Sequence, residues 1–372
     1  MRVLLVSPYP DPRWLSMERY TERLVLRADR VTFSQAYGSY FRPPRAIGWA
    51  LPMYRGRPAL QPARAVGNDL VHVTDHALAH HIPLFRQWPT VTTCHDIIPV
   101  LVGVQPASLV GRVRRKLYRR STNALKDAPS IIAVSEFTKR SLVKFLGVDP
   151  ERVDVVPVAI PDDFAPLEGA NDYLAAQGVV LPPGPRVLSI GHAGRNKNLA
   201  LLLEAMARPE LAGAALVRVG RPLSGPLRER VTRLGLVSRV VDLGAVPAEV
   251  LLALYSACDV LAQPSWLEGF GIPVAEAQAC GLPVVCSDGG SLPEVGGRAA
   301  RIVPLGGTPG AQPDPDTVGR FASALAEVIS DAALATTMRT RGFEQARQLR
   351  PDVVAPQLAA AYEKAMNRWQ AR

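Results

Sequence analysis

Cysteine and long apolar runs are scarce in this chain of 372 residues, and each scarcity excludes a class of protein. No apolar run approaches the ~18 residues that a membrane-spanning helix needs. The apolar part of the N-terminus is too short for a signal peptide, so we expect a cytoplasmic protein whose first residues form a buried strand. The cysteines lack metal-site spacing and are expected to be buried free thiols: Cys94, Cys258, Cys280 and Cys286.

The common phosphate-binding fingerprints are also missing, because neither a Walker A loop nor a Gly-x-Gly-x-x-Gly pattern occurs. Instead, an apolar strand at Val187–Ile190 leads into the loop Gly191-His-Ala-Gly-Arg195-Asn-Lys197. Ligands bind at the carboxyl ends of parallel strands. We therefore predict that Arg195 and Lys197 clamp a diphosphate and stabilise it as a leaving group. A solvated loop is the alternative, since basic loop residues are commonly just exposed.

Apolar runs alternate with helical patterns along the whole chain, which is typical of parallel sheets covered by helices. The length favours two domains at ~150 residues each, with a linker in the Pro/Gly-bearing stretch 160–185. The predicted strands are Val3–Val6, Leu70–Val73, Val91–Thr93, Ile131–Val134, Val153–Val156, Val187–Ile190, Leu216–Val219, Val240–Leu243, Val260–Ala262, Val284–Cys286 and Arg301–Val303. The predicted fold class is α/β, with two Rossmann-like domains.

Two carboxylates frame the most informative stretch, Ser265-Trp-Leu-Glu268-Gly-Phe-Gly-Ile-Pro-Val-Ala-Glu276. The stretch opens a helix, and a helix N-terminus favours an anion. Gly269 and Gly271, on either side of Phe270, let the backbone approach a ligand closely. Glu276 is placed to accept hydrogen bonds from a diol such as a ribose.

This Glu-x7-Glu stretch closely resembles the signature of the retaining family 4 glycosyltransferases, in particular the mannosyltransferase-like members. The segment from Gly281 to Gly296 continues the resemblance, which covers nearly the whole chain. It implies the GT-B fold, with two Rossmann-like domains facing a cleft. Residues 1–165 would bind the acceptor and residues 166–350 the nucleotide sugar. The final helix, 351–372, would cross back to the first domain.

The resemblance also assigns roles to single residues. It gives catalytic roles to His95, Arg195, Lys197 and Glu268, with His95 facing the transferred sugar and Asp96 as a second contact. The segment Leu243–Asp259 resembles the one that lies against the nucleotide base. The implied donor-binding set is Gly191, Arg195, Lys197, Gly244, Val246, Glu268, Gly269, Phe270, Gly271 and Glu276.

One segment departs from the family pattern. Members usually carry a glycine-rich loop after the first strand, where this chain has Leu15-Ser-Met-Glu18-Arg19-Tyr20. The absence of those glycines would crowd the cleft and place Glu18 near phosphates. Glu18 and Arg19 are therefore acceptor-side candidates, and three interpretations stay open: altered acceptor chemistry, an altered site or an inactive one.

Positive charge is concentrated in the first half of the chain. Residues 1–165 contain 23 Lys and Arg against 14 Asp and Glu, a net +9, while residues 166–372 contain 20 against 19, a net +1. The densest part is a predicted helix with basic residues around an apolar stripe: Arg112, Arg114, Arg115, Lys116, Arg119 and Arg120. A solvated helix and peripheral attachment to an anionic inner membrane surface are both compatible with this pattern. The sequence has no aromatic platform or motif for nucleic acid.

The expected function is transfer of a hexose from a nucleotide sugar to a glycan or lipid-linked acceptor, as in polysaccharide biosynthesis. The resemblance implies a retaining reaction without a metal or another cofactor, because Arg195, Lys197 and the helix dipole would replace the metal. A nucleotide-sugar epimerase of GT-B architecture and an inactive donor-binding scaffold are the alternatives.

Overall fold

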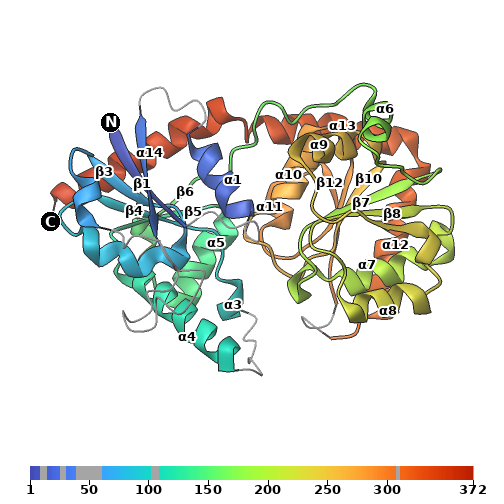
Figure 1. The fold of residues 1–372 in the computed structure, drawn as a ribbon, viewed down its shortest axis with the longest axis horizontal. Coiled ribbons are helices and arrows are strands. Elements are labelled where there is room, and N and C mark those ends of the chain that lie inside the picture. The colour runs from blue at the N-terminus through green and yellow to red at the C-terminus, as the bar shows by residue number, and fades with distance from the viewer. Residues whose placement is uncertain (9–14, 26–30, 39–60, 102–108, 307–310, 372) are drawn as a thin grey trace. The chain divides into compact units, whose positions relative to one another are not determined.

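The computed structural model describes all residues except 9–14, 26–30, 39–60, 102–108, 307–310 and 372 (Figure 1). The side chains of the helical residues 15–19, 62, 109–115 and 117 also lie outside the described part. Two compact units make up the chain. Unit 1 contains Met1–Ala159 together with Pro351–Arg372, and unit 2 contains Ile160–Arg350. The division after Ala159 lies a few residues before the expected boundary at 165, so the predicted linker stretch belongs to unit 2.

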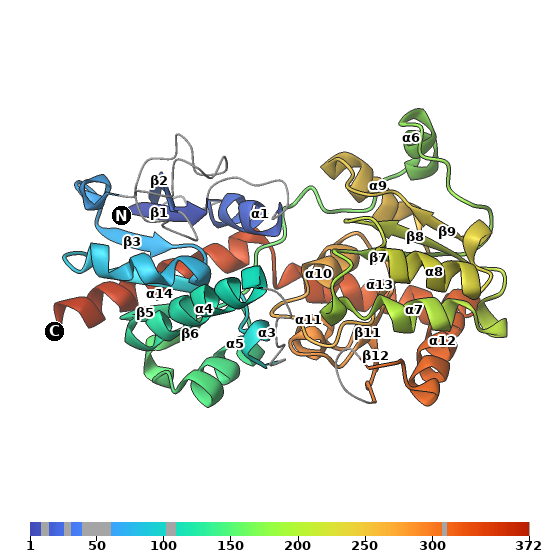
Figure 2. The same ribbon diagram turned by 60° about the horizontal axis from the view of Figure 1, so that its bottom comes forward.

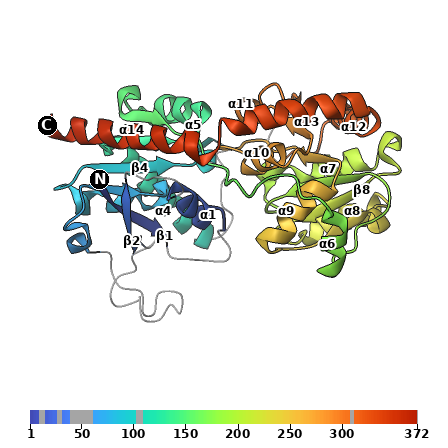
Figure 3. The same ribbon diagram turned by 90° about the horizontal axis from the view of Figure 1, so that it is seen from above.

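Unit 1 is built on a six-stranded parallel sheet with the strand order β2-β1-β3-β4-β5-β6. One face is covered by η3, α4 and α5, and the other by α1 and α14 (Figures 1 and 3). The strands are β1 (Arg2–Pro8), β2 (Thr32–Gly38), β3 (Leu70–Val73), β4 (Thr90–Cys94), β5 (Ser130–Ala133) and β6 (Val153–Val155). The helices are α1 (Leu15–Leu24), η2 (Pro62–Ala65), η3 (His76–Phe85), α3 (Ile98–Leu101), α4 (Leu109–Ala124), η4 (Leu125–Asp127), α5 (Glu136–Ser141), η5 (Leu142–Leu146), η6 (Pro150–Arg152) and α14 (Pro351–Gln370).

Unit 2 repeats the architecture with the strand order β12-β11-β10-β7-β8-β9. Helices α7, α8 and α12 cover one face and α9 and α10 the other (Figure 2). The strands are β7 (Arg186–Ile190), β8 (Ala215–Val219), β9 (Val240–Asp242), β10 (Val260–Gln263), β11 (Val284–Ser287) and β12 (Ala300–Val303). The helices are α6 (Ala170–Ala176), η7 (Arg195–Lys197), α7 (Leu199–Met206), η8 (Pro209–Leu211), α8 (Gly225–Arg233), η9 (Val237–Arg239), α9 (Ala248–Ala257), α10 (Ile272–Ala279), α11 (Leu292–Gly296), α12 (Pro315–Ser330) and α13 (Ala332–Arg347).

The parallel sheets confirm the predicted α/β class. In both units the inner strands of the sheet are buried on two faces, so their sequences are apolar runs rather than alternating patterns. The four cysteines are free and buried, as expected. Burial raises the pKa of Cys286 to about 12, so its thiol stays protonated.

Helix α14 returns the chain to the sheet of unit 1, where it lies along β4 and β5 (Figure 3). Its apolar face buries Val354, Leu358 and Ala361. On the polar side, Lys364 and Arg368 both pair with Asp154, each at 2.8 Å. The last residues of the chain are therefore part of the first unit.

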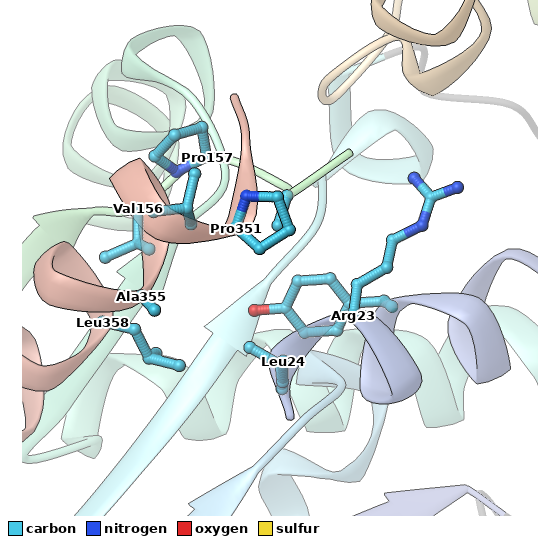
Figure 4. A pocket seen from close by; sticks show the side chains of 10 residues that line it. Arg23, Leu24, Val156, Pro157, Pro351, Ala355 and Leu358 are labelled. Atoms are coloured by element: carbon cyan, nitrogen blue, oxygen red, sulfur yellow. The ribbon is translucent and has the colours of Figure 1, made fainter. Parts of the chain in front are cut away.

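Figure 4 shows a small pocket in unit 1, between α1 and the start of α14. Most of its lining is apolar, apart from Tyr20 and Arg23. The lining residues are Tyr20, Arg23, Leu24, Val156, Pro157, Ala159, Pro351, Val354, Ala355 and Leu358. Of these, Tyr20 also contacts a predicted site residue, His95.

Candidate active site

A buried ion pair lies at the centre of the predicted donor site in unit 2. Lys197 Nζ is 2.6 Å from Glu268 Oε1, and Gln263 Nε2 donates a hydrogen bond of 2.8 Å to the same oxygen. Burial opposes ionisation of Glu268, but the Lys197 ammonium and the hydrogen bonds hold the pKa of this carboxyl below its ordinary value. The site therefore contains a fixed carboxylate beside a fixed ammonium.

The loop that follows β10 places Glu268 through its backbone. The Glu268 carbonyl accepts hydrogen bonds from the N–H and the hydroxyl of Ser291, at 3.1 and 3.0 Å. The backbones of Glu268 and Gly290 also form an isolated parallel β-bridge. A Cβ atom on Gly290 would lie 2.4 Å from the Glu268 carbonyl oxygen, so this position requires glycine. The strand β10 ends in Gln263, whose buried amide then reaches Glu268.

Lys197 comes from the loop after β7, as predicted. The Trp266 N–H donates to the Asn196 carbonyl at 2.7 Å, which ties this loop to the one that contains Glu268. Gly191 lies beneath the lysine, since a Cβ atom there would be 3.4 Å from Lys197 Cε. Arg195 is in the same loop but is exposed, so the structure brings Lys197 and Glu268 into contact and leaves Arg195 at the rim.

Glu276 lies within α10 and is only 2% exposed. The hydroxyl of Tyr255 on α9 donates a hydrogen bond of 2.6 Å to Glu276 Oε2. The sequence analysis missed Tyr255, because it lies in the apolar helix Ala248–Ala257, whose pattern indicates burial and not a polar contact. It also missed Gln263. The signal that could have identified it is its position as a polar residue at the end of a buried strand.

The remaining donor-side candidates are backbone positions at the same edge of the sheet. Gly244 follows β9, and its carbonyl accepts from the Gly220 N–H at 2.8 Å. Val246 is half-buried two residues further on, and the stretch from Gly269 to Gly271, including Phe270, is buried. These positions lie after β9 and β10, at the sheet edge that also holds Lys197.

His192 is a further titratable group in the Lys197 loop. Its Nδ1 accepts a hydrogen bond of 2.9 Å from the Gly194 N–H, which fixes the ring. Partial burial, followed by the Lys197 ammonium, lowers the pKa of His192 below its ordinary value. The imidazole in the Lys197 loop is therefore neutral.

The predicted sugar contact in unit 1, His95, follows β4 directly and is mostly buried. Its Nε2 lies 2.9 Å from the Thr74 carbonyl oxygen, which can only accept, so Nε2 carries the proton and donates. In the neutral imidazole Nδ1 is then an acceptor. Burial lowers the pKa of His95. The Tyr20 ring packs edge-on against it at 4.4 Å, and the Tyr20 hydroxyl is 2.9 Å from Thr93 Oγ1.

Behind His95, a second histidine extends the network into the core. His72 is fully buried, with Nε2 2.7 Å from Thr93 Oγ1 and Nδ1 2.8 Å from the Tyr362 hydroxyl on α14. Burial, followed by the charge of His95, lowers the pKa of His72 to about 3. The residues behind His95 are therefore neutral hydrogen-bonding groups, and the sequence analysis did not single out His72.

The other acceptor-side candidates have mixed outcomes. Asp96 Oδ1 accepts a hydrogen bond of 2.9 Å from the Ile98 N–H, so this carboxylate caps α3. The side chains of Glu18 and Arg19 lie outside the described residues, as do those of Arg112, Arg114 and Arg115. On the same helix, α4, the side chains of Lys116, Arg119 and Arg120 are exposed.

The described residues offer neither a cluster of metal ligands nor a single helix that could span a membrane. No group of three or more His, Cys, Asp or Glu side chains in this part of the chain could hold a metal ion. Within the same ranges no single helix is long and apolar enough to cross a bilayer, although α12 with α13–α14 passes that test as a pair bent by 94°.

Two family models match the chain, one over each unit. The model described as Glycosyltransferase Family 4 matches residues 27–164, and that described as Glycosyl transferases group 1 matches residues 178–345. The second match includes Lys197, Glu268 and Glu276, and the first includes His95.

Curated relatives of similar sequence are named as glycosyltransferases. The O-antigen chain mannosyltransferase B of Escherichia coli is 29% identical over 331 residues, which are 86% of this chain and 77% of that protein. The D-inositol 3-phosphate glycosyltransferase of Mycolicibacterium smegmatis is 31% identical over 255 residues, 66% of this chain and 55% of that protein. The serotype-specific mannosyltransferase WbdA of Escherichia coli is matched over 26% of its length, so the chain spans only part of some relatives.

Solved structures share the fold over the whole chain. Sucrose-phosphate synthase from Thermosynechococcus elongatus has a TM-score of 0.74 at 21% identity, with 98% of each chain covered. Anabaena HepE in complex with UDP-glucose has a TM-score of 0.72 at 19% identity, covering 97% of this chain and 98% of that one. At these identities the likeness concerns the fold alone.

Proposed function

This chain belongs to the family 4 glycosyltransferases of GT-B fold, and on that premise we propose which transfer it catalyses. The proposed donor is a nucleotide sugar, and the acceptor is a hydroxyl group of a glycan or a lipid-linked glycan. A mannosyl group is the first hexose to test, since two of the similar proteins are named mannosyltransferases. The product belongs to polysaccharide biosynthesis.

The ion pair between Lys197 and Glu268 is the observation that carries this proposal. An ammonium held at 2.6 Å by an ionised carboxylate is preorganised, so it loses little freedom when charge develops on a leaving diphosphate. Glu268 in turn presents carboxylate oxygen to a sugar hydroxyl. Arg195, exposed in the same loop, adds a second cation. Glu276, beside the Tyr255 hydroxyl, accepts hydrogen bonds from the hydroxyls of the ribose.

The proposed reaction retains the anomeric configuration and uses no metal. The leaving diphosphate accepts the proton of the acceptor hydroxyl on the face from which it departs, so no protein nucleophile is needed. Lys197 and Arg195 supply the positive charge that a metal would supply elsewhere. His95 contributes a neutral imidazole that hydrogen-bonds the transferred sugar, supported by the low pKa that burial imposes on it.

Nucleotide release with and without candidate acceptors tests the function. A thermal-shift panel of UDP-, GDP- and ADP-sugars first selects the donor, because a ligand at 100 times its dissociation constant stabilises by about 2.7 kcal/mol. Acceptor-dependent release, with a product of unchanged anomeric configuration by NMR and unchanged rate in EDTA, is the expected result. An altered sugar nucleotide without acceptor identifies an epimerase. Donor binding without any turnover identifies a scaffold.

We further propose a cytoplasmic protein that attaches peripherally to the inner face of an anionic membrane through α4. The exposed Lys116, Arg119 and Arg120 support this, and the net charge of +9 in residues 1–165 acts in the same direction.

A further inference from the structure

Arg218 is an unusual residue for the strand that contains it. It lies within β8, between Val217 and Val219, and is only 1% exposed. Burying a guanidinium in a central strand is costly unless it is paired, and an apolar residue of similar size is often as stable there. Burial lowers the pKa of Arg218, because the charged form loses its hydration. A buried charge of this kind needs partners, and these indicate its role.

The guanidinium of Arg218 joins three segments at the carboxyl edge of the sheet. Its Nη2 donates to the Gly191 carbonyl at 2.8 Å, and its Nη1 donates to the Arg221 carbonyl at 2.6 Å. Nη1 is also 3.3 Å from Asp242 Oδ1. The three partners follow β7, follow β8 and end β9. A planar guanidinium can reach all of them because its donors point in fixed, different directions.

The backbones of the same segments are packed directly against one another. The Gly191 N–H donates to the Val219 carbonyl at 2.9 Å, and the Gly220 N–H to the Gly244 carbonyl at 2.8 Å. A Cβ atom on Gly220 would lie 2.1 Å from the Gly191 carbonyl oxygen. With no room for a side chain between them, a shift of one segment moves the other.

Gly191 links this arrangement to the donor site. Lys197 crosses over Gly191, within 3.4 Å of where a Cβ atom would be, before it reaches Glu268. We propose that Arg218 is a positioning residue of the donor site, whose guanidinium fixes the Gly191 peptide and thereby sets the place of Lys197. This inference rests on the proposed function, in which Lys197 binds the donor diphosphate.

A second arginine of unit 2 provides a matched control. Arg239 donates to the carbonyls of Met206, Leu211 and Ala214, and burial lowers its pKa as well. Arg239 precedes β9, however, so it joins segments at the amino edge of the sheet, away from Lys197. If arginines of this kind only stabilise unit 2, replacing either one has the same consequences.

The experiment measures diphosphate affinity separately from stability. Arg218→Met and Arg239→Met keep the side-chain volume and remove the charge, and each is titrated with inorganic pyrophosphate in calorimetry, with its melting temperature measured in parallel. We expect Arg218→Met to weaken pyrophosphate binding about tenfold, the scale of one lost charge-assisted hydrogen bond. Arg239→Met should lower the melting temperature and leave pyrophosphate affinity unchanged. Equal affinities in the two variants and wild type would overturn the proposal.

Arg218→Lys covers the case in which Arg218→Met does not fold. Its ammonium keeps the charge but cannot bridge Gly191 and Arg221 in the same geometry, so we expect severalfold weaker pyrophosphate binding. Wild-type affinity in this variant would also overturn the proposal.

Lys197→Ala separates this inference from the proposed function. If Arg218 acts through Lys197, the effects of Arg218→Lys and Lys197→Ala on pyrophosphate affinity are not additive in the double variant. Additive effects contradict the inference alone and leave the donor site in place. Unchanged affinity in Lys197→Ala contradicts the proposed function, and the inference with it.

Discussion

The carboxyl edges of the two sheets are built from different chemistry. In unit 2 the edge depends on charge: Lys197 pairs with Glu268, and Arg218 pairs with Asp242. In unit 1 the groups behind His95 are neutral, a chain of imidazole and hydroxyl side chains that are almost entirely buried: His72, Thr93, Tyr20 and Tyr362.

This difference indicates what each edge can bind. Fixed cations among closely packed glycines suit a diphosphate, which has high charge and needs close backbone approach. Neutral donors and acceptors suit the hydroxyls of a sugar, which would gain little from a nearby charge. Two sheets of similar architecture can therefore carry different chemistry, because the residues at the strand ends differ.

The largest expected effect comes from removing the Lys197 ammonium of unit 2. Lys197→Ala should reduce kcat by about 10²–10³, because one electrostatic contact to the developing charge is lost. Steady-state kinetics with the identified donor measure it. Lys139→Ala is the control, since Lys139 is also half-buried but donates to the Val153 carbonyl in unit 1. Near-normal turnover in Lys197→Ala would remove the proposed role.

Glu276 tests whether the carboxylates of unit 2 also bind the donor. Glu276→Ala should weaken nucleotide-sugar binding by about 1.5–3 kcal/mol, since charge-assisted hydrogen bonds to the ribose are lost. Tyr255→Phe removes only the hydroxyl that donates to Glu276 and should have a smaller effect. Calorimetry on both variants compares them, and unchanged donor affinity in folded Glu276→Ala would exclude Glu276 from the site.

The buried, neutral His72 predicts a pH dependence of the stability of unit 1. An unfolded histidine binds a proton near pH 6.5, whereas buried His72, with its pKa lowered to about 3, does not. Below pH 6.5 protons therefore favour the unfolded state, and stability falls as the pH falls toward 3. From pH 7 to pH 5 this linkage lowers the free energy of unfolding by about 2 kcal/mol.

The measurement compares wild type with His72→Gln by hydrogen exchange of the strands of unit 1. Carboxyl groups titrate equally in both proteins, so the difference isolates His72. The variant should be less stable at pH 7 and should lose less stability on acidification. Parallel curves for the two proteins would show that His72 is not the responsible group.

The smallest expected effect concerns the surface of α4. Arg119→Gln should weaken binding to anionic vesicles by about 1 kcal/mol, roughly fivefold. High salt should weaken binding of the wild type as well, because the Debye length falls from ~10 Å at 0.1 M to ~3 Å at 1 M. Co-sedimentation measures both effects. Arg341→Gln, an exposed position in unit 2, is the control, and equal binding of all three proteins would indicate a solvated helix.

The sequence predicted most of the fold because parallel strands buried on both faces are apolar runs. It predicted β3 as Leu70–Val73, the bounds that the structure has. It missed β2, Thr32–Gly38, which pairs only with β1 and is largely exposed, so its residues lack the apolar signal. It also missed α6, in the stretch interpreted as a linker.

At the candidate site, sequence identified residues whose spacing is local. Glu268 and Glu276 share one loop and helix, and Lys197 follows a strand. Their contacts are distant in sequence: Tyr255 lies 21 residues from Glu276, and Lys197 lies 71 residues from Glu268. No periodicity encodes such pairs, because the fold alone brings them together. Whether each site residue acts as proposed stays a prediction.

Helix α14 has a consequence for the order in which the chain folds during synthesis. The hydrogen-bond partner of His72 is Tyr362, which is translated 290 residues later. At about 5–20 residues per second, His72 waits roughly 15–60 s for Tyr362, and the continuous unit 2 is synthesised in that interval. We expect unit 2 to resist protease on the ribosome before unit 1 does. Pulse proteolysis of the chain truncated after Arg350 and released from the ribosome measures this difference, and equal resistance of both units in that chain would contradict it.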